Sequence, residues 1–382
     1  MSVYDTVVGQ AAAVAQLSRA ASPEGSLAQA WLIAGPPGSG RSSIARAFAA
    51  SLLCDHPVSG QGCGECQPCR TVLAGTHGDV TVVRTETLTI SKNEVRELVA
   101  TAQRAPSSGR HRVLIIEDAD RMSPGTFNVL LKAIEEPPPR TVWMLCVPSP
   151  QDLAQTIRSR CRVVNLQVPP PEAVAALLID RDGISPELAH RAAASAQGHI
   201  GIARRYGLNP DSLAEREDSA RKLLALTSVG HAIAFAKTLI ERAESEAHAE
   251  ADEASSRERE AFMRGAGIEP GGRIPPALRA QVKALDDEAK RRATRLVRDV
   301  IDRYLLDIHS VLRDVLSLQL ETDAPLVNPG IERELSERTR VHSPHTTLAL
   351  LDAVGVARER VGMNVPPQLA LEALIAAIVA AR

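Results

Sequence analysis

Residues 35–43 read GPPGSGRSS, and this stretch decides the fold. Its spacing follows the phosphate-loop pattern G-x-x-x-x-G-K-[ST], with Arg41 at the position of the lysine. An apolar strand-like run, Trp31–Ala34, precedes the loop, and a helix-like run, Ser42–Leu53, follows it. In this context, backbone N–H groups and the start of a helix can surround phosphate oxygens. The sequence therefore predicts a P-loop α/β domain.

The arginine in this loop puts hydrolysis in doubt. A lysine reaches the β- and γ-phosphates as a compact charge, whereas arginine is a longer, planar fork. Binding of ATP or ADP without hydrolysis stays open, because the glycines and Ser42 can still hold phosphate groups. The candidate nucleotide-binding residues are Gly35, Pro36, Pro37, Gly38, Ser39, Gly40, Arg41, Ser42 and Ser43.

The composition narrows the class of protein. A chain of 382 residues has room for two or three domains, and its net charge of −2 excludes a generally basic nucleic-acid-binding surface, though not a local one. Only 2% of residues are aromatic, so the core must consist of Ala, Leu, Val and Ile. No signal peptide is visible, and the apolar run Leu369–Ala381 is short and contains Glu372. We therefore expect a cytoplasmic protein whose six cysteines do not form disulfides.

Residues 1–168 alternate short apolar runs with amphipathic stretches, which indicates a parallel sheet with helices on its faces. Three prolines at 169–171 mark a boundary, so we predict a helical lid at 169–208 and an all-helical domain at 209–382. The expected strands are Trp31–Ala34, Asp79–Val83, Val113–Glu117, Thr141–Val147 and Val163–Leu166. The expected helices include Ser91–Arg104, Met122–Ile134, Pro171–Leu178, Pro186–Ala196 and Lys283–Leu320. A Gly/Pro-rich break at 265–276 predicts an exposed turn or loop, and the role of residues 240–295 stays open.

Four cysteines, Cys54, Cys63, Cys66 and Cys69, have the spacing of a zinc site. Four thiolates close a tetrahedral centre and leave no open position, so the predicted zinc is structural rather than catalytic. The alternatives are free thiols in a loop, or His56 as one of the ligands. Cys146 and Cys161 lie in apolar surroundings and are interpreted as ordinary buried thiols.

The run VLIIEDAD at 113–120 is a predicted buried strand that ends in acidic residues. P-loop proteins place their metal-binding and water-activating carboxylates at this point, usually in the order Asp then Glu. Here the order is Glu117 then Asp118, so the geometry of a magnesium site would be disturbed. The alternative is that both acids merely end the strand.

The tripeptide Ser159-Arg160-Cys161 follows a helix-like segment, Leu153–Arg158. An arginine at such a place can reach a neighbouring subunit's γ-phosphate as an arginine finger. Taken alone, the tripeptide is uninformative, because most arginines are solvated surface charges.

Several segments together resemble a known family. VVGQ at 7–10, GPPGSGRSS at 35–43, the four-cysteine insert, IIEDADRM at 115–122, NVLLKAIEEPP at 128–138 and TIRSRC at 156–161 occur in order. They resemble the AAA+ clamp-loader subunits of bacterial DNA polymerase III. The resemblance covers about residues 1–210, and the rest is similar only in being a helical, collar-like region.

Within this family the chain is most similar to the delta-prime class, the stator, rather than to the gamma/tau motors. The motors keep a P-loop lysine, an Asp-Glu pair and two polar sensors, where this chain has Arg41, Glu117-Asp118, Val147 and Gly201. The resemblance thus implies a subunit without ATPase activity of its own, inside the DNA polymerase III holoenzyme.

The resemblance also implies partners. They are gamma/tau and delta subunits, the sliding clamp, and primer–template DNA reached through the complex, with Arg160 acting in trans as an arginine finger. Helix N-termini of this family follow DNA phosphates, which makes Ser91 and Lys92 candidate phosphate contacts. The alternative for these two is helix capping by Ser91 and a solvated lysine.

Two other functions remain open at this point. One is an ATPase-active motor of the same family with a degenerate loop, which turnover by the isolated chain would reveal. The other is a zinc-containing nucleic-acid-binding module with a vestigial P-loop, which salt-dependent binding to primed DNA without partners would favour.

Overall fold

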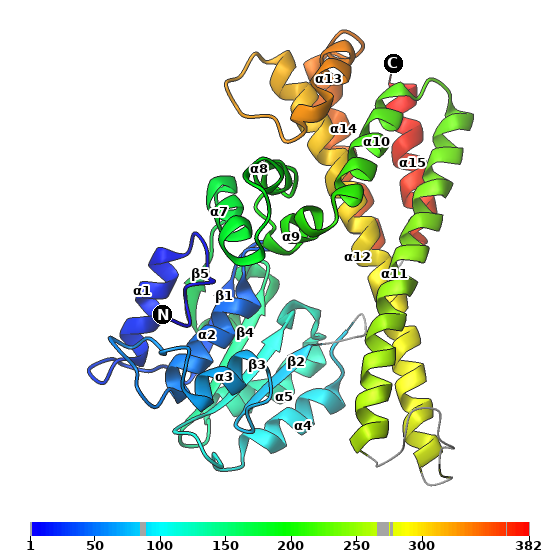
Figure 1. Ribbon diagram of the computed structural model, residues 1–382. Helices are drawn as coiled ribbons and strands as arrows, with labels where there is room; N and C mark the ends of the chain where they lie inside the picture. Colours follow the sequence, from blue (N-terminus) through cyan, green and yellow to red (C-terminus); the bar gives the residue numbers. More distant parts are fainter. Residues whose placement is uncertain (1, 85–88, 266–274, 276–277, 364, 382) are drawn as a thin grey trace. The chain divides into compact units, whose positions relative to one another are not determined.

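The computed structural model describes residues 2–84, 89–265, 275, 278–363 and 365–381 (Figure 1). The chain forms two compact units, Met1–Pro210 and Asp211–Arg382. Unit 1 contains two hydrophobic clusters and unit 2 a third. The predicted Gly/Pro-rich break at 265–276 lies almost wholly outside the described residues.

Unit 1 is built on a five-stranded parallel sheet with the strand order β2-β3-β4-β1-β5. All five strands predicted from apolar runs are confirmed, each to within one residue of its predicted ends. They are β1 (Ala30–Ala34), β2 (Val80–Arg84), β3 (Arg112–Glu117), β4 (Thr141–Val147) and β5 (Arg162–Asn165). The predicted α/β class is thereby confirmed.

Both faces of this sheet are covered, which explains why its central strands are continuously apolar. Every residue of β1, β3 and β4 is buried. Along β1, Trp31 and Ile33 enter one hydrophobic cluster, and Leu32 and Ala34 enter the other. The first cluster includes α1 (Ala11–Ala21), α2 (Arg41–Leu53) and α3 (Gln67–Leu73); the second includes α4 (Lys92–Ala102) and α5 (Pro124–Glu135) (Figure 1).

The remaining elements of unit 1 follow β3 in the chain. η1 (Ala119–Arg121), η2 (Pro150–Asp152) and α6 (Gln155–Arg158) connect the last strands, and α7 (Pro171–Asp182), α8 (Pro186–Ser195) and α9 (Ile200–Leu208) complete the unit. α7 continues four residues beyond its predicted end at Leu178, to Asp182, and the next residue, Gly183, caps it with a left-handed φ of 66°. The separate lid domain at 169–208 stays a prediction, because these helices belong to the same compact unit as the sheet.

A buried carboxylate organises the loop that enters β3. Asp79 is fully buried, and its carboxylate accepts hydrogen bonds from the backbone N–H groups of Ser107, Ser108 and Gly109 at 2.6–2.8 Å. Arg112, also buried, donates to the same carboxylate at 3.2 Å. Charge-assisted bonds of this kind hold the loop against the sheet and satisfy a charge that would otherwise be costly to bury.

Unit 2 is all-helical. Its helices are α10 (Pro210–Ala225), α11 (Val229–Gly265), α12 (Arg279–Gln319), α13 (Glu332–Thr339), α14 (Pro344–Gly362) and α15 (Pro367–Ala380), with a short η4 (Pro329–Ile331). The buried residues of its core are Ala, Leu, Val and Ile, as the composition predicts. Among the described residues, no helix combines the length and the apolar character needed to cross a bilayer.

Candidate metal centre and degenerate nucleotide site

The four predicted cysteine ligands come together at one point. Their Sγ atoms all lie within 4.8 Å of one another. The Sγ atom of Cys54 lies 3.7 Å from that of Cys63 and 3.8 Å from that of Cys66. A tetrahedral zinc with bonds of about 2.3 Å would separate its sulfur ligands by about 3.8 Å. The thiols therefore fit a closed tetrahedral centre, and His56 is not needed to complete it.

Local backbone geometry positions these thiols. Cys54 follows the last residue of α2, Cys66 is the N-cap of α3, and Cys69 lies within α3. The backbone N–H of Cys63 donates to Cys54 Sγ, and that of Cys66 donates to Cys63 Sγ, both at 3.3 Å. The latter bond is the main reason that the pKa of the Cys63 thiol falls to about 6. Such N–H donors stabilise thiolates, which are the metal-binding form of cysteine.

The cysteine module is also joined to the beginning of the chain. Val58 and Gln61 form a small antiparallel bridge around a turn at Ser59 and Gly60, both with positive φ. A Cβ atom on Gly60 would lie 1.8 Å from the carbonyl oxygen of Ser18 in α1, so the turn is pressed against that helix. The N–H of Val3 donates to the carbonyl of Gly62 at 3.1 Å. These contacts make the module an integral part of unit 1.

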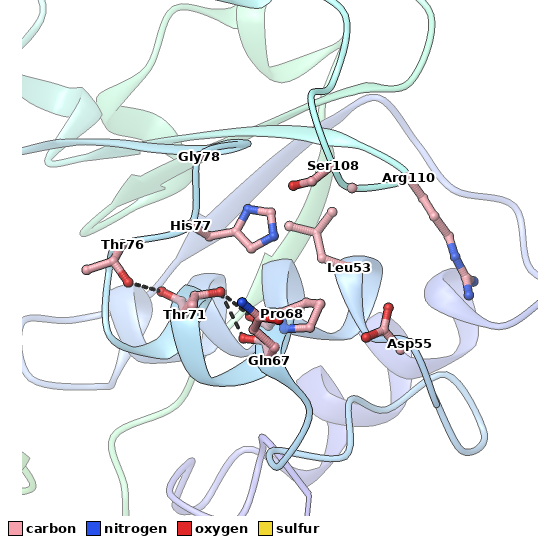
Figure 2. A pocket seen from close by; sticks show the side chains of 11 residues that line it. Leu53, Asp55, Gln67, Pro68, Thr71, Thr76, His77, Gly78, Ser108 and Arg110 are labelled. Carbon is pink, nitrogen blue, oxygen red and sulfur yellow. Dashed lines mark hydrogen bonds between the residues drawn. The ribbon is translucent and has the colours of Figure 1, made fainter.

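A cavity of about 340 Å³ lies beside the cysteine module (Figure 2). The end of α2, the helix α3 and the loop around Ser108 line it, with the His77 ring among the lining side chains (Figure 2). His77 Nδ1 accepts the N–H of Asp79, so this ring is tied to the same loop anchor.

The P-loop has the predicted position between β1 and α2. Gly40, the second glycine of the pattern, has a φ of 90°, and Gly38 between the two pattern glycines has a φ of 81°; side chains rarely adopt either value, so glycine is favoured at both positions. Arg41 turns back into its own loop, where Nη1 donates to the carbonyl oxygen of Gly35 at 3.1 Å. Its Nη2 lies 3.9 Å from Asp118 Oδ1. The guanidinium thus contacts both the loop and the neighbouring acid.

The acid that ends β3 is held by two arginines. Arg46 Nη2 donates to Glu117 Oε1 at 3.2 Å, and Arg84 Nε donates to Oε2 at 3.0 Å. The Glu117 side chain is only 4% exposed, so these two guanidinium groups are its principal counter-charges. Both carboxylate oxygens are engaged by guanidinium groups, whose positive charges disfavour a metal ion at the same oxygens. Asp118 follows with a left-handed φ of 54°.

The helix α9 begins directly on the P-loop. Its N-cap, His199, lies against Gly38, because a Cβ atom on that glycine would be 2.2 Å from His199 Cγ. The N–H of Ile200 points to the Gly38 carbonyl oxygen at 3.4 Å. Gln10 makes a second connection: its side-chain amide donates to the carbonyl oxygens of Ser39 and Gln167 at 3.2 and 2.8 Å. Hydrogen bonds and packing therefore connect the P-loop with α9 and with the segment before α7.

The two sensor positions have no polar side chain. Val147 ends β4 with its side chain fully buried, and its carbonyl accepts the N–H of Gly35 at 3.1 Å. Gly201 lies in the first turn of α9, and a Cβ there would meet His199 at 3.3 Å. Neither residue can donate a side-chain hydrogen bond to a phosphate.

Arg160 follows the short helix α6 and is partly exposed, with 39% of its side chain accessible. Its Nη1 donates to the carbonyl oxygen of Thr156 at 2.7 Å, and its Nη2 lies 2.6 Å from Glu135 Oε1. Glu135 is the last residue of α5. The role of Arg160 in trans stays a prediction.

The candidate DNA contact begins α4. Ser91 is its N-cap and forms a capping box, in which Glu94 N donates to Ser91 Oγ and Ser91 N donates to Glu94 Oε2. Lys92, the first helical residue, is exposed. The capping interpretation of Ser91 accounts for its hydroxyl, and a phosphate contact by Ser91 and Lys92 stays a prediction.

Sequence reasoning missed several residues that define this region. The pairing of Arg84 with Glu117 had a readable signal, because the two residues end adjacent parallel strands in register. Arg46, His199 and Glu135 had no comparable signal, since each meets its partner only through tertiary packing. Of the two cysteines outside the cluster, Cys146 is buried as interpreted, whereas Cys161 is only half-buried. Burial raises the pKa of both thiols to about 12.

Comparison with known proteins shows what residues 9–170 are similar to. Residues 9–170 match the model of a family described as DNA polymerase III, delta subunit. A delta-prime subunit of DNA polymerase III from Pseudomonas aeruginosa is 39% identical over 152 residues, which are 39% of this chain and 46% of that protein. A tau/gamma subunit from Haemophilus influenzae is 35% identical over 187 residues, which are 49% of this chain and 25% of that protein.

The matched part therefore spans less than half the length of either relative. Among solved structures, a DNA polymerase III gamma subunit-related protein from Thermotoga maritima is 16% identical, with a TM-score of 0.43 over 97% of this chain and 99% of that one. The sheet, the P-loop and the cysteine module all lie within or beside the matched residues. Residues 9–170 are therefore similar to the family described as DNA polymerase III, delta subunit.

Proposed function

We propose that this chain is the delta-prime, or stator, subunit of a bacterial clamp loader. It would act in the cytoplasm within the DNA polymerase III holoenzyme, with gamma/tau and delta subunits, to place the sliding clamp on primed DNA. Unit 1 would contribute the AAA+ platform and its lid, and unit 2 the collar helices for assembly. The match to the delta subunit family and the 39% identity to a delta-prime subunit support this proposal.

The ion pairs of Glu117 with two arginines are the observation that favours a stator over a motor. A motor needs this acid free to organise a metal ion and the attacking water. In this chain, Arg46 and Arg84 engage both oxygens of the Glu117 carboxylate. The changes at Val147 and Gly201 act in the same direction, because each removes a polar contact to nucleotide phosphates. Arg41 adds to this effect, because its guanidinium donates into its own loop.

Arg160 would act on a neighbour rather than on a nucleotide of its own. As an arginine finger it would stabilise the charge that develops on the γ-phosphoryl group bound by an adjacent motor subunit. Its partial exposure leaves it accessible to such a partner. The helix start at Ser91 and Lys92 would add a sequence-independent contact with DNA phosphates.

Cys54, Cys63, Cys66 and Cys69 would hold a structural zinc ion. The metal supplies a rigid cross-link between the end of α2 and α3, and no step of the loading reaction passes through it. The mutual distances of the sulfur atoms support this assignment.

Assembly tests the proposal directly. Purified chain is mixed with gamma/tau and delta subunits and separated by size-exclusion chromatography, and the complex is then assayed for clamp loading on primed DNA. If the chain is a stator, it forms a stable complex with the other subunits, clamp loading depends on its presence, and the chain alone does not hydrolyse ATP. Robust magnesium-dependent turnover by the isolated chain would identify a motor instead. Salt-dependent binding to primed DNA without partners would favour the nucleic-acid-binding module.

A further inference from the structure

The guanidinium group of Arg160 is held from two sides by different elements. The carbonyl oxygen of Thr156 in α6 accepts a hydrogen bond from Nη1 at 2.7 Å. Ser159 Oγ, just after this helix, lies 3.4 Å from the same nitrogen. From the end of α5, Glu135 Oε1 lies 2.6 Å from Nη2. A guanidinium has five N–H donors, and these contacts use only part of them. Donors therefore remain for the oxygens of an arriving phosphate.

An arginine finger must be held in one orientation and must still be able to bind a phosphate. Two properties of the contact between Glu135 and Arg160 meet these requirements. Arginine is a long side chain with many rotamers, and an anchored guanidinium loses less freedom when it binds a phosphate. At the same time, Glu135 and Arg160 are 41% and 39% exposed, and ion pairs at such exposure are weak. The pair therefore restrains the side chain without trapping it.

We propose that Glu135 is a positioning residue for Arg160. It holds the guanidinium beside α6 in the orientation from which it meets the neighbour's γ-phosphate. This inference rests on the proposed function of Arg160 as a trans finger. Glu135 is the last residue of α5 and the first acid of the EEPP sequence, whose prolines stop the helix. The proposal assigns this acid a function.

The competing explanation is a surface ion pair that contributes only to local stability. A structural pair and a positioning pair differ in how their effects combine. If Glu135 acts through Arg160, its removal has no effect once Arg160 is gone. If it acts independently, the two effects multiply.

The experiment uses the reconstituted loader with native chain, Glu135→Ala, Glu135→Gln, Arg160→Ala and the double variant Glu135→Ala/Arg160→Ala. Glu136→Ala is the matched control, because it removes the neighbouring acid from the same helix end. Size-exclusion chromatography first checks assembly. Clamp- and DNA-stimulated ATPase activity is then measured as kcat and as KM for ATP.

We expect Arg160→Ala to lower kcat, and Glu135→Ala to lower it by a smaller factor with KM unchanged, because positioning acts on the transition state. Glu135→Gln keeps an oxygen acceptor and should lie between native and Glu135→Ala. The double variant should equal Arg160→Ala, and Glu136→Ala should equal native. If Glu135→Ala fails to assemble, Glu135→Gln alone and combined with Arg160→Ala decides the question by the same comparison.

Different results would contradict the proposed finger and the proposed positioning residue. A native rate for Arg160→Ala would remove the proposed finger itself. A reduced rate for Arg160→Ala together with native rates for both Glu135 variants would overturn the positioning role alone. So would a double variant that is slower than Arg160→Ala by the full factor of Glu135→Ala.

Discussion

Arg84 and Glu117 end two adjacent parallel strands at the same level, and Arg84 Nε donates to Glu117 Oε2 at 3.0 Å. Arg46 from α2 engages the other oxygen of the same carboxylate. At the edge where a P-loop protein keeps a free acid for its metal ion, this chain therefore has an acid that is already paired twice.

This pairing predicts that restoring the P-loop lysine will not restore hydrolysis. The native chain and Arg41→Lys should both show no steady-state ATP turnover above a control protein, because Glu117 remains paired and the sensor positions remain apolar. The measurement is phosphate release by the isolated chain in the presence of magnesium. Turnover by Arg41→Lys would show that the lysine alone limits catalysis.

The cysteine cluster predicts about one zinc per chain by elemental analysis. Cys66→Ser should lose the metal and lower Tm by roughly 5–10 °C, because metal binding stabilises the folded state. Cys161→Ser is the matched control, since this thiol lies outside the cluster. A folded, metal-free preparation in which all four thiols react freely would contradict the assignment.

Arg160→Ala is expected to leave folding and assembly intact while slowing ATP-driven clamp loading. Fingers of this type contribute on the order of 10³–10⁵ in rate at a single site. Only one of several sites would face this subunit, so the loss for the whole complex should be much smaller. Arg160→Lys should not rescue loading, because lysine lacks the planar fork. Arg158→Ala, on the same helix end, should load at the native rate; equal loss in both variants would argue for a structural effect.

The contact between α9 and the P-loop predicts an unusually sensitive glycine. Gly38→Ala should lower the free energy of unfolding by about 2–3 kcal/mol, because it combines a left-handed φ with a clash against His199. Gly183→Ala isolates the first effect, since φ there is 66° and no atom lies within 4 Å of the added Cβ; about 1 kcal/mol is expected. Adding His199→Ala should relieve Gly38→Ala only in part, because the His199 Cα would still lie 2.6 Å away. Equal losses at both glycines in urea unfolding would refute the contact.

The Asp79 anchor predicts a stability contribution that depends on pH. Burial by itself raises the pKa of this carboxyl, but the N–H donors of Ser107, Ser108 and Gly109 outweigh it and hold the pKa well below the ordinary value. A lowered folded-state pKa means that the stabilisation is complete above the unfolded-state value of about 4 and declines as the pH falls below it.

Asp79→Asn should therefore lower the free energy of unfolding by about 1–3 kcal/mol at pH 7, because an amide cannot accept all of these bonds. The difference from the native chain should narrow below about pH 4. Urea unfolding at several pH values measures it, with the exposed Asp55→Asn as control. A difference that stays constant down to pH 3 would exclude the ionised carboxylate as its source.

The sequence predicted unit 1 well because its signals are local. Apolar runs located all five strands, and the cysteine spacing located the candidate metal centre. Helix ends were less accurate where capping decides them. The predicted helix Met122–Ile134 begins at Pro124, because Ser123 takes the N-cap position and proline suits the first turn.

The features that distinguish a paired acid from a free one were beyond sequence reasoning. Arg46 is one of many arginines in the chain, and only packing brings it to Glu117. His199 reaches Gly38 through the path of the chain around α7 and α8. In unit 2, residues 240–264 are part of a long helix, Val229–Gly265, because their small apolar residues recur at helical spacing and are buried.

The counter-charges of Glu117 and Asp118 are covalent parts of the chain and cannot dissociate. A domain whose acids rely on a bound ion changes its charge balance whenever magnesium or nucleotide arrives or leaves, and its stability follows their concentrations by mass action. In this chain the charges of these acids are balanced during folding, when β2, β3 and α2 pack together. A ring built from nucleotide-responsive subunits would thereby contain one member that stays the same through each cycle, against which the movements of the others can be directed.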